Sequence, residues 1–461
     1  MTIVQSTNYR WRWVALGALL LAEAMNLLDT TVVQVAAPTI RAELGATAGQ
    51  LQWLTAGYTL PFAVLLLTGG RAGDVGGRRF AFTCGTVVFV LCSLVCAVAP
   101  NVAVLMAARA VQGASAAFVV PQTYGLIRAM FRGAEVAKAL GTIGPVMALA
   151  AVCGPVVGGA LTQLDLFGSG WRAVFLVNVP LGVLVLLLVP WIREDRSVRA
   201  PRLDLFGTLL AAVGVGLLVF PLVQGNDAGW PRWTWICLGC GAVLLGAFAL
   251  HQSRKARDPL VEPGLFRDRA FPIALGCSVL FFAVLNGLMF VLVVFFQAEP
   301  GHGPLAAGLS VLPWSVGLGA GSLLTGSVLV PRFGLRVIRL GALLLALGLA
   351  STAGLLAVGG FRLWVALLVA GTGAGVFTVP FFTGALSRVA HHETGSAAGL
   401  LNAVQQLGAT TGVAVLGAVY LARGSAVQAL WIGVAATVVV LALTYPMIGR
   451  PAHTGPSHGH P

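Results

Sequence analysis

Charged residues are scarce in this sequence. Only 9% of its 461 residues are Asp, Glu, Lys or Arg, and only 15 are acidic. Soluble globular proteins carry about 25% charged residues, so an ordinary soluble domain is excluded. The mean hydropathy of +0.91 indicates a membrane protein instead. The net charge of +13 then indicates basic loops beside an anionic membrane surface rather than a nucleic-acid partner.

Motifs of catalysis and metal binding are also missing. The chain has no P-loop, no HExxH, no GxSxG and no cluster of histidines within an apolar run. We therefore expect neither an enzyme nor a protein with a cofactor, a metal or a nucleotide. Cys237 and Cys240 form a CxxC, but no His or acid flanks it, so packing residues are favoured over a redox or zinc site. The tail from 451 to 461 is predicted to be disordered; a metal role is the alternative for its His453, His458 and His460.

Long apolar runs fill the chain from end to end. Each is long enough to cross a hydrocarbon core of ~30 Å, and each is too long and continuous for a barrel strand. The first run follows Arg10 and Arg12 and exceeds the length of a signal peptide, so we interpret it as a helix. The sequence predicts an all-α membrane protein with fourteen helices at 13–36, 51–68, 80–98, 102–126, 138–163, 172–191, 204–224, 233–251, 271–295, 305–329, 337–358, 362–387, 395–421 and 427–448.

The basic residues orient these helices. With both termini in the cytoplasm, 22 of the 28 Lys and Arg residues fall in cytoplasmic segments and five in outer loops. This bias satisfies the positive-inside rule and supports a multi-pass protein of the bacterial cytoplasmic membrane. The one remaining basic residue, Arg109, lies within the fourth predicted helix.

A weak internal repeat suggests how the helices are grouped. The segment from 327 to 336 follows the tenth helix as GGRAGDVGGRR follows the second, with Gly334 and Arg336 aligned to Gly77 and Arg79. Repeated halves are common in secondary transporters. We predict a six-helix bundle at 1–200, two inserted helices with a cytoplasmic linker at 201–270 and a second six-helix bundle at 271–450.

The loop between the second and third helices is rich in glycine and arginine. Its glycines, Gly70 and Gly77 among them, permit positive φ and close approach of helices. Asp74 is the only acid beside Arg71, Arg78 and Arg79, so an ion pair or a contact with a helix end is expected. A role in topology alone is the alternative.

Two acids, Glu23 and Asp29, and one arginine, Arg109, lie well inside predicted helices. Arg109 requires a partner or water, because an arginine in the middle of a span costs at least ~2.5–3.5 kcal/mol; a purely structural partnership is the alternative to function. Gln112 lies one turn along on the same flank. Glu23 and Asp29 need not share a helix face. One could carry a proton and the other meet a cationic substrate, or Asp29 could be a structural anchor.

The fifth predicted helix carries two Gly-Pro pairs. Gly144-Pro145 and Gly154-Pro155 each weaken the helix, since proline removes a backbone donor. Gly154 and Gly158 also form a small-xxx-small face, which suits close packing. Packing alone could explain the glycines, but it explains the two Gly-Pro pairs less well than a helix that both packs and flexes.

These motifs together resemble the major facilitator superfamily, in particular its fourteen-helix drug:proton antiporters of the EmrB/QacA kind. The similar segments cover nearly the whole chain and occur in the expected order, at Leu28–Ile40, Gly69–Phe80, Leu105–Ala117, Cys153–Leu161, Trp171–Val183 and in the thirteenth helix. The chain departs from the family at Val75, where a basic residue is usual, and at Gln34, where asparagine is usual.

The resemblance implies roles for the motif residues. It implies proton coupling by Asp29, Arg109 and Gln112, and a conformational latch of Gly70, Asp74, Gly77, Arg78 and Arg79. It implies a gating motif, typical of antiporters, of Gly144, Pro145, Gly154, Pro155, Gly158 and Gly159. The polar and aromatic residues expected to meet substrate are Glu23, Asp29, Gln34, Trp53, Tyr58, Asn286, Trp314 and Phe381, and Asn178 is among further polar residues that could line a cavity.

The sequence therefore predicts a monomeric exporter of amphipathic, cationic or neutral drugs or antibiotics, driven by the proton gradient and working by alternating access. The alternatives are a proton-coupled uptake symporter and an exporter of an endogenous metabolite. A membrane-embedded enzyme and a channel are disfavoured by the missing catalytic motifs and the sparse charge.

Overall fold

The computed structural model describes residues 9–165, 168–196, 203–255, 259–298, 303–356, 360–387, 389 and 393–448. Every regular element in these ranges is helical, as the sequence predicts. The tail with His453, His458 and His460 lies outside the described residues.

Eight helices form the N-terminal half. Their ends follow local sequence signals: Thr47 and Gln50 form a capping box at the start of α2, Asn101 caps α4, and Gly45 ends α1 in the left-handed conformation. The helices are α1 (Arg12–Leu44), α2 (Ala48–Gly76), α3 (Arg78–Ala97), α4 (Val102–Met130), α5 (Ala134–Gly141), α6 (Ile143–Gln163), α7 (Ala173–Leu176) and α8 (Asn178–Leu188).

Two helices follow as an antiparallel pair, the inserted hairpin, and eight more form the C-terminal half. The hairpin consists of α9 (Leu205–Ala228) and α10 (Arg232–Arg254). The C-terminal half consists of α11 (Ala270–Ala298), α12 (Pro304–Ser310), α13 (Leu312–Leu324), α14 (Val330–Phe333), α15 (Val337–Leu355), α16 (Gly360–Leu386), α17 (Thr394–Arg423) and α18 (Ala426–Ile448).

Thirteen helical stretches in the described ranges are long and apolar enough to cross a membrane. One of them, Pro304–Leu355, has 52 residues and would extend about 78 Å if straight, far more than the ~30 Å of a hydrocarbon core. It is broken at Gly334, which has φ of 60°. This stretch contains both the predicted tenth and the predicted eleventh helix. The fourteen predicted spans therefore correspond to the thirteen stretches, because one stretch holds two spans.

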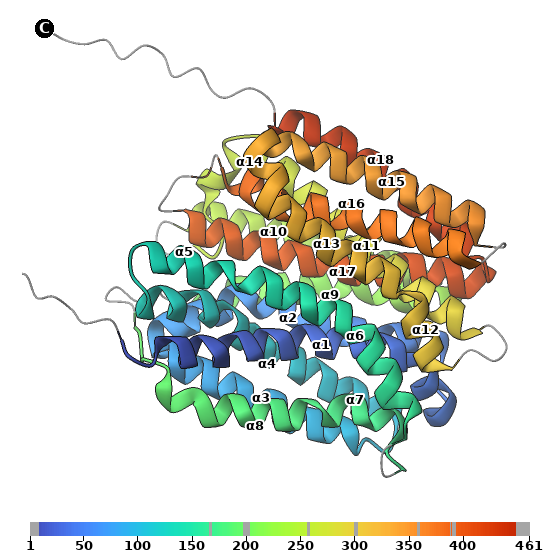
Figure 1. Cartoon of the computed structure of the whole chain (residues 1–461), viewed down its shortest axis with the longest axis horizontal. Coiled ribbons are helices and arrows are strands. Elements are labelled where there is room, and N and C mark those ends of the chain that lie inside the picture. Colours follow the sequence, from blue (N-terminus) through green and yellow to red (C-terminus); the bar gives the residue numbers. More distant parts are fainter. Residues whose placement is uncertain are drawn as a thin grey trace, which may run out of the picture.

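The two halves repeat the same packing partners. In the N-terminal half, α4 packs against α2 and α3, and α3 also packs against α8. In the C-terminal half, α16 packs against α13 and α15, and α15 also packs against α18. The aligned turn glycines Gly77 and Gly334 both have positive φ. Figure 1 shows the N-terminal half in blue to green in the lower part of the view and the C-terminal half in yellow to red in the upper part.

The halves meet along a seam between α2 and α17 and at their outer ends. At the outer end, Gln297 Nε2 donates to Val35 O over 2.7 Å, and Leu305 N donates to Gln163 Oε1 over 3.3 Å. One large apolar cluster there contains residues of both halves. At the cytoplasmic end, by contrast, one cluster contains N-terminal residues such as Leu16 and another contains C-terminal residues such as Leu265. The structure is therefore closed on its outer side.

Candidate functional site

A buried ion pair lies in the middle of the N-terminal half. Arg109 of α4 is 1% exposed, and its Nη1 lies 2.5 Å from Oδ2 of Asp29 on α1, which is 0% exposed. Arg109 Nη1 also donates to Gln112 Oε1 over 2.8 Å, and Nε donates to Leu54 O on α2 over 3.2 Å. A buried charge pair is better tolerated when further hydrogen bonds support it, and Gln112 and Leu54 supply such bonds to Arg109.

Close helix packing brings this arginine to its partners. One turn after Arg109, Gly113 lies against the backbone of Tyr58, and a side chain at that position would clash with the Tyr58 carbonyl. The missing side chain lets α2 approach α4. The guanidinium then lies 4.3 Å from the centre of the Tyr58 ring, within the range of a cation–π contact.

The other carboxylate oxygen of Asp29 is held by two amides. Its Oδ1 accepts from Asn178 Nδ2 over 2.7 Å and from Gln112 Nε2 over 3.2 Å. Gln112 Nε2 also donates to Ser93 Oγ over 2.8 Å. Helices α1, α3, α4 and α8 thus each contribute a polar side chain to one network. We call these five residues, Asp29, Ser93, Arg109, Gln112 and Asn178, the core polar network.

Sequence reasoning found three members of this network and missed the other two as members. Asn178 was considered only as a possible cavity residue, and Ser93 was not considered at all. Asn178 begins α8 after a break at Val177, and nothing in its local pattern indicates Asp29 as its partner. Ser93 resembles the many small hydroxyl residues of membrane helices, so the sequence holds no signal for it.

Glu23 lies in a different environment from Asp29. Its side chain is 2% exposed, and its Oε1 accepts no hydrogen bond from any described residue. Thr123 and Tyr124 of α4 face it, and within the described part of the chain no salt bridge reaches it. Of the two buried acids of α1, Glu23 and Asp29, only Asp29 is ion-paired.

The remaining substrate-contact candidates are dispersed. Tyr58 donates from its hydroxyl to Asn26 Oδ1 and so lies beside the core polar network. Trp53 packs with its ring 6.0 Å from Phe220 of the inserted hairpin. Gln34 is 4% exposed on α1. In the C-terminal half, Asn286 donates to its own helix at Phe282 O, Trp314 is 2% exposed, and Phe381 stacks on Phe377 with ring centres 5.1 Å apart.

The predicted latch residues pair within the N-terminal half. Asp74 accepts from Arg78 Nη2 over 2.7 Å, as the lone acid among arginines suggests. Arg78 Nη1 also lies 2.7 Å from Oδ2 of Asp195, and Arg79 N donates to Glu194 Oε1 over 3.0 Å. The segment 194–195, which sequence analysis did not single out, thus belongs to the same cluster of charged residues.

Two glycines of the loop lie where a side chain would be disfavoured or crowded. Gly77, with φ of 110°, makes the turn between α2 and α3, which favours glycine. Gly70 packs beside Pro121 of α4. Val75, where the family usually has a basic residue, is 44% exposed.

Helix α6 packs against both halves through its glycines. Gly154 and Gly158 lie against Thr31 and Val32 of α1, where a Cβ at Gly158 would be 2.8 Å from Val32 Cα. On another side, a Cβ at Gly159 would be 2.6 Å from Pro304 O of the C-terminal half. Gly308 in turn lies against the carbonyl of Pro155.

The first Gly-Pro pair has a different place from the second. Gly144 and Pro145 follow the break at Thr142 that separates α5 from α6, and Gly144 has open space beside it. Pro155 lies inside α6. The fifth predicted span is thus a broken helix whose outer part seals the two halves together.

Two helical halves with repeated packing, a buried charge network within one of them and contact between them at one membrane face are typical of a secondary transporter. Comparison with known families agrees. The family described as Major Facilitator Superfamily matches residues 19–413, and the chain belongs to it. It is a transport protein rather than an enzyme, and a multi-pass protein of the bacterial cytoplasmic membrane.

Several curated relatives are similar over most of their length. A probable actinorhodin transporter of Streptomyces coelicolor is 44% identical over 89% of this chain and 73% of that protein. A puromycin resistance protein of Streptomyces alboniger is 37% identical over 88% and 82%, and a methylenomycin A resistance protein of Streptomyces coelicolor is 33% identical over 92% and 90%. A crystal structure of a peptide transporter has the same fold, with a TM-score of 0.67 at 15% identity and coverage of 94% of both chains.

Proposed function

We propose that this transporter exports amphipathic antibiotics or drugs, cationic or neutral, across the cytoplasmic membrane in exchange for protons, as a drug:proton antiporter of the superfamily. The observation that carries the proton coupling is the buried pair of Asp29 and Arg109. The substrate class is supported by relatives named for actinorhodin, puromycin and methylenomycin A. No cofactor is needed, because the proton gradient supplies the energy.

The core polar network supplies a proton-dependent switch. In the outer-closed state, an ionised Asp29 holds Arg109 over 2.5 Å. Protonation of Asp29 removes the negative charge, and Arg109 keeps only neutral acceptors, Gln112 Oε1 and Leu54 O. A buried arginine without a counter-charge is strongly destabilised, so α4 shifts relative to α1. Release of the proton restores the pair.

Glu23 is the acid that we assign to cationic substrates. It is buried, and none of the described cations pairs with it, so a positively charged ligand can supply the missing partner. Neutral substrates do not need this contact. This division of roles explains how one transporter accepts both classes.

Efflux of a fluorescent cationic dye from cells tests the proposal. Cells with the protein should hold the dye at a low level, and an uncoupler should abolish that effect. Dye efflux that persists after the proton gradient has collapsed would contradict proton coupling. Net uptake driven by the gradient would instead favour a symporter, and indifference to every drug would favour an endogenous metabolite.

A further inference from the structure

The inserted hairpin carries a second charge cluster, built around one buried carboxylate and separate from the core polar network. Asp204, 4% exposed, directly precedes α9 and accepts from Gly207 N over 3.0 Å. From the end of α10, Lys255 Nζ lies 3.0 Å and His251 Nε2 lies 3.1 Å from its carboxylate, and Gln252 Nε2 donates over 2.9 Å. We call Asp204 and its three α10 partners the hairpin hub.

The hub fixes the cytoplasmic linker that follows α10. The other end of the Gln252 amide, Oε1, accepts from Leu260 N over 2.7 Å. Gln252 is 4% exposed, so this bridge from Asp204 to Leu260 is shielded from water. There is little room for change: a Cβ at Gly207 would lie 2.5 Å from Asp204 Oδ2 and 2.6 Å from Gln252 Nε2.

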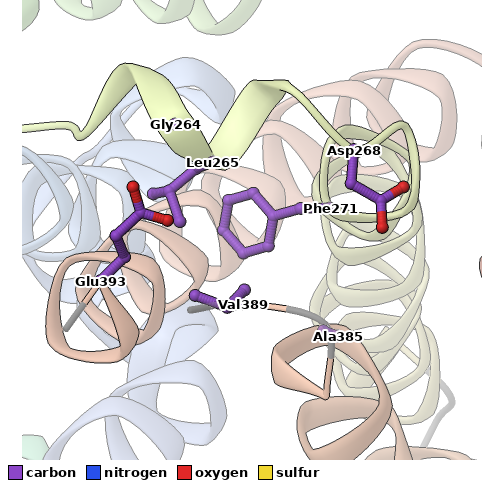
Figure 2. A pocket seen from close by; sticks show the side chains of 7 residues that line it. All are labelled: Gly264, Leu265, Asp268, Phe271, Ala385, Val389 and Glu393. Carbon is purple, nitrogen blue, oxygen red and sulfur yellow. The ribbon is translucent and has the colours of Figure 1, made fainter. Parts of the chain in front are cut away.

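Two neighbouring carbonyls of the linker bind to different halves of the transporter. Pro259 O accepts from Arg71 Nη2 at the cytoplasmic end of α2, in the N-terminal half. Leu260 O accepts from Ser396 Oγ of α17, in the C-terminal half, over 3.3 Å. The next turn of the linker is seated on the C-terminal half, where Leu265 packs beside Phe271 and Val389 around a small hollow bordered by Glu393 (Figure 2).

The hairpin itself also spans the seam between the halves. Helix α9 packs against both α2 and α17. Val215 and Val219 of α9 share an apolar cluster with Ala56 of α2 and Ala414 of α17. Near the hub, Thr208 Oγ1 lies 2.7 Å from Thr68 Oγ1 of α2.

We propose that the hairpin hub makes the inserted hairpin and the linker at 259–261 a tether across the cytoplasmic end of the α2/α17 seam, which limits how far the two halves separate when the transporter opens to the cytoplasm. Arg71 and Ser396 bind adjacent carbonyls, so a rotation that separates α2 from α17 must break one of these bonds. The hub anchors Leu260 through Gln252 Oε1, so movement of the linker alone would not relieve the strain. The inference requires only that the halves move relative to one another, and not the proposed substrate or proton coupling.

Spin-label distances between the cytoplasmic ends of the halves test the tether. Phe80 and Phe333, 61% and 62% exposed, follow α2 and end α14 in opposite halves. They are replaced by labelled cysteines in a full-length variant in which the seven native cysteines are substituted, and distances are measured in lipid nanodiscs without substrate. Gln252→Leu, which breaks the bridge from the hub to Leu260, should broaden the distribution toward longer distances and lower the maximal efflux rate several-fold.

Glu135→Gln is the matched control. It breaks the cytoplasmic-side ion pair of Glu135 with Arg12, 2.9 Å long, which lies within one half, and it should leave the distance distribution unchanged. If Gln252→Leu does not fold, Ser396→Ala removes only the link to α17 and should give a smaller shift in the same direction. A wild-type distribution in the folded Gln252→Leu variant, or in Ser396→Ala when the former fails to fold, would overturn the proposal. An equal shift in Glu135→Gln would also overturn it.

Discussion

Arg109 of α4 and Asp29 of α1 form an ion pair in which the arginine is 1% and the aspartate 0% exposed. Membrane helices rarely hold a full charge pair at this depth, and the surrounding amides of Gln112 and Asn178 satisfy the second carboxylate oxygen. Protonation of the Asp29 carboxylate can therefore change how α1 and α4 pack. The first two predictions concern this pair.

Replacement of Arg109 by alanine should abolish transport and leave membrane insertion intact. It leaves Asp29 buried without its counter-charge, and loss of one partner of a buried pair costs about 3–5 kcal/mol. Thermal unfolding of the purified protein should show a lowered Tm. The double variant Arg109→Ala, Asp29→Asn should recover part of that loss, because no charge remains buried. Wild-type efflux by Arg109→Ala would show that the arginine is structural only.

Asp29→Asn should uncouple transport from the proton gradient. Asparagine keeps the size of the side chain but has no carboxyl group to bind or release a proton, so the switch is fixed. Substrate movement down its own gradient should persist in vesicles, whereas a pH gradient should no longer drive accumulation. Wild-type pH-driven accumulation by this variant would assign the proton to another residue, and Glu23→Gln would then be the next variant to assay.

Glu23→Gln should separate cationic from neutral substrates. The unpaired carboxylate Oε1 favours a positive ligand, and glutamine removes that attraction. Efflux of a permanently charged dye should fall several-fold, while efflux of a neutral drug of similar size should change little. Equal losses for both classes would contradict the assignment of Glu23 to cation binding.

Gly159→Ala should weaken the outer seal. A Cβ at this position would lie 2.6 Å from Pro304 O and 2.7 Å from Leu305 Cα, and both atoms belong to backbone that cannot rotate away. We expect protons to leak through vesicles containing this variant, measured with a pH-sensitive dye. Gly141→Ala is the control, because nothing lies within 4 Å of a Cβ there. A Gly159→Ala variant that leaks no protons would show that the two halves can repack around the added methyl group.

Asp204 should stabilise the protein at neutral pH and lose this effect in acid. Burial alone would raise the pKa of Asp204. The hydrogen bonds from Gln252, the Gly207 backbone, Lys255 and His251 together outweigh this effect, so the pKa lies below its usual range. A depressed carboxyl pKa stabilises the folded state above the unfolded value of about 3.9, and the effect fades as the pH falls below it. Asp204→Asn should therefore lower Tm at pH 7. The difference in Tm between this variant and the wild type should become smaller in strong acid. A difference in Tm that does not depend on pH would contradict this prediction.

Much of the architecture follows from local sequence patterns. Apolar runs gave the spans, because each must satisfy its backbone hydrogen bonds within itself, and the asymmetry of Lys and Arg gave their orientation. The one difference in count arises at Gly334, where a short turn leaves two spans within a single helical stretch. The close helix packing at Gly154 and Gly158 was also predictable, since small residues four positions apart indicate close packing.

The partners of the charged residues were not predictable in the same way. Because Arg109 lies in an apolar run, the sequence shows that it needs a partner. Asp29 and Gln112 could be named from the sequence as candidates for that partner. Ser93 and Asn178 meet these residues, and Glu194 and Asp195 meet the loop after α2, only because segments distant in the chain pack together. A hydrogen bond between residues far apart in the chain leaves no periodic trace in either segment.

The sequence by itself determined that this chain is a helical membrane transporter with an arginine that needs a counter-charge, because hydropathy and charge act locally on each span. Only the tertiary structure decided that Asp29 is paired and Glu23 is not, and that Asp204, an ordinary acid at the start of a span, joins the hairpin to the linker. These outcomes depend on which helix faces lie against one another, and the packing of glycine surfaces sets those faces.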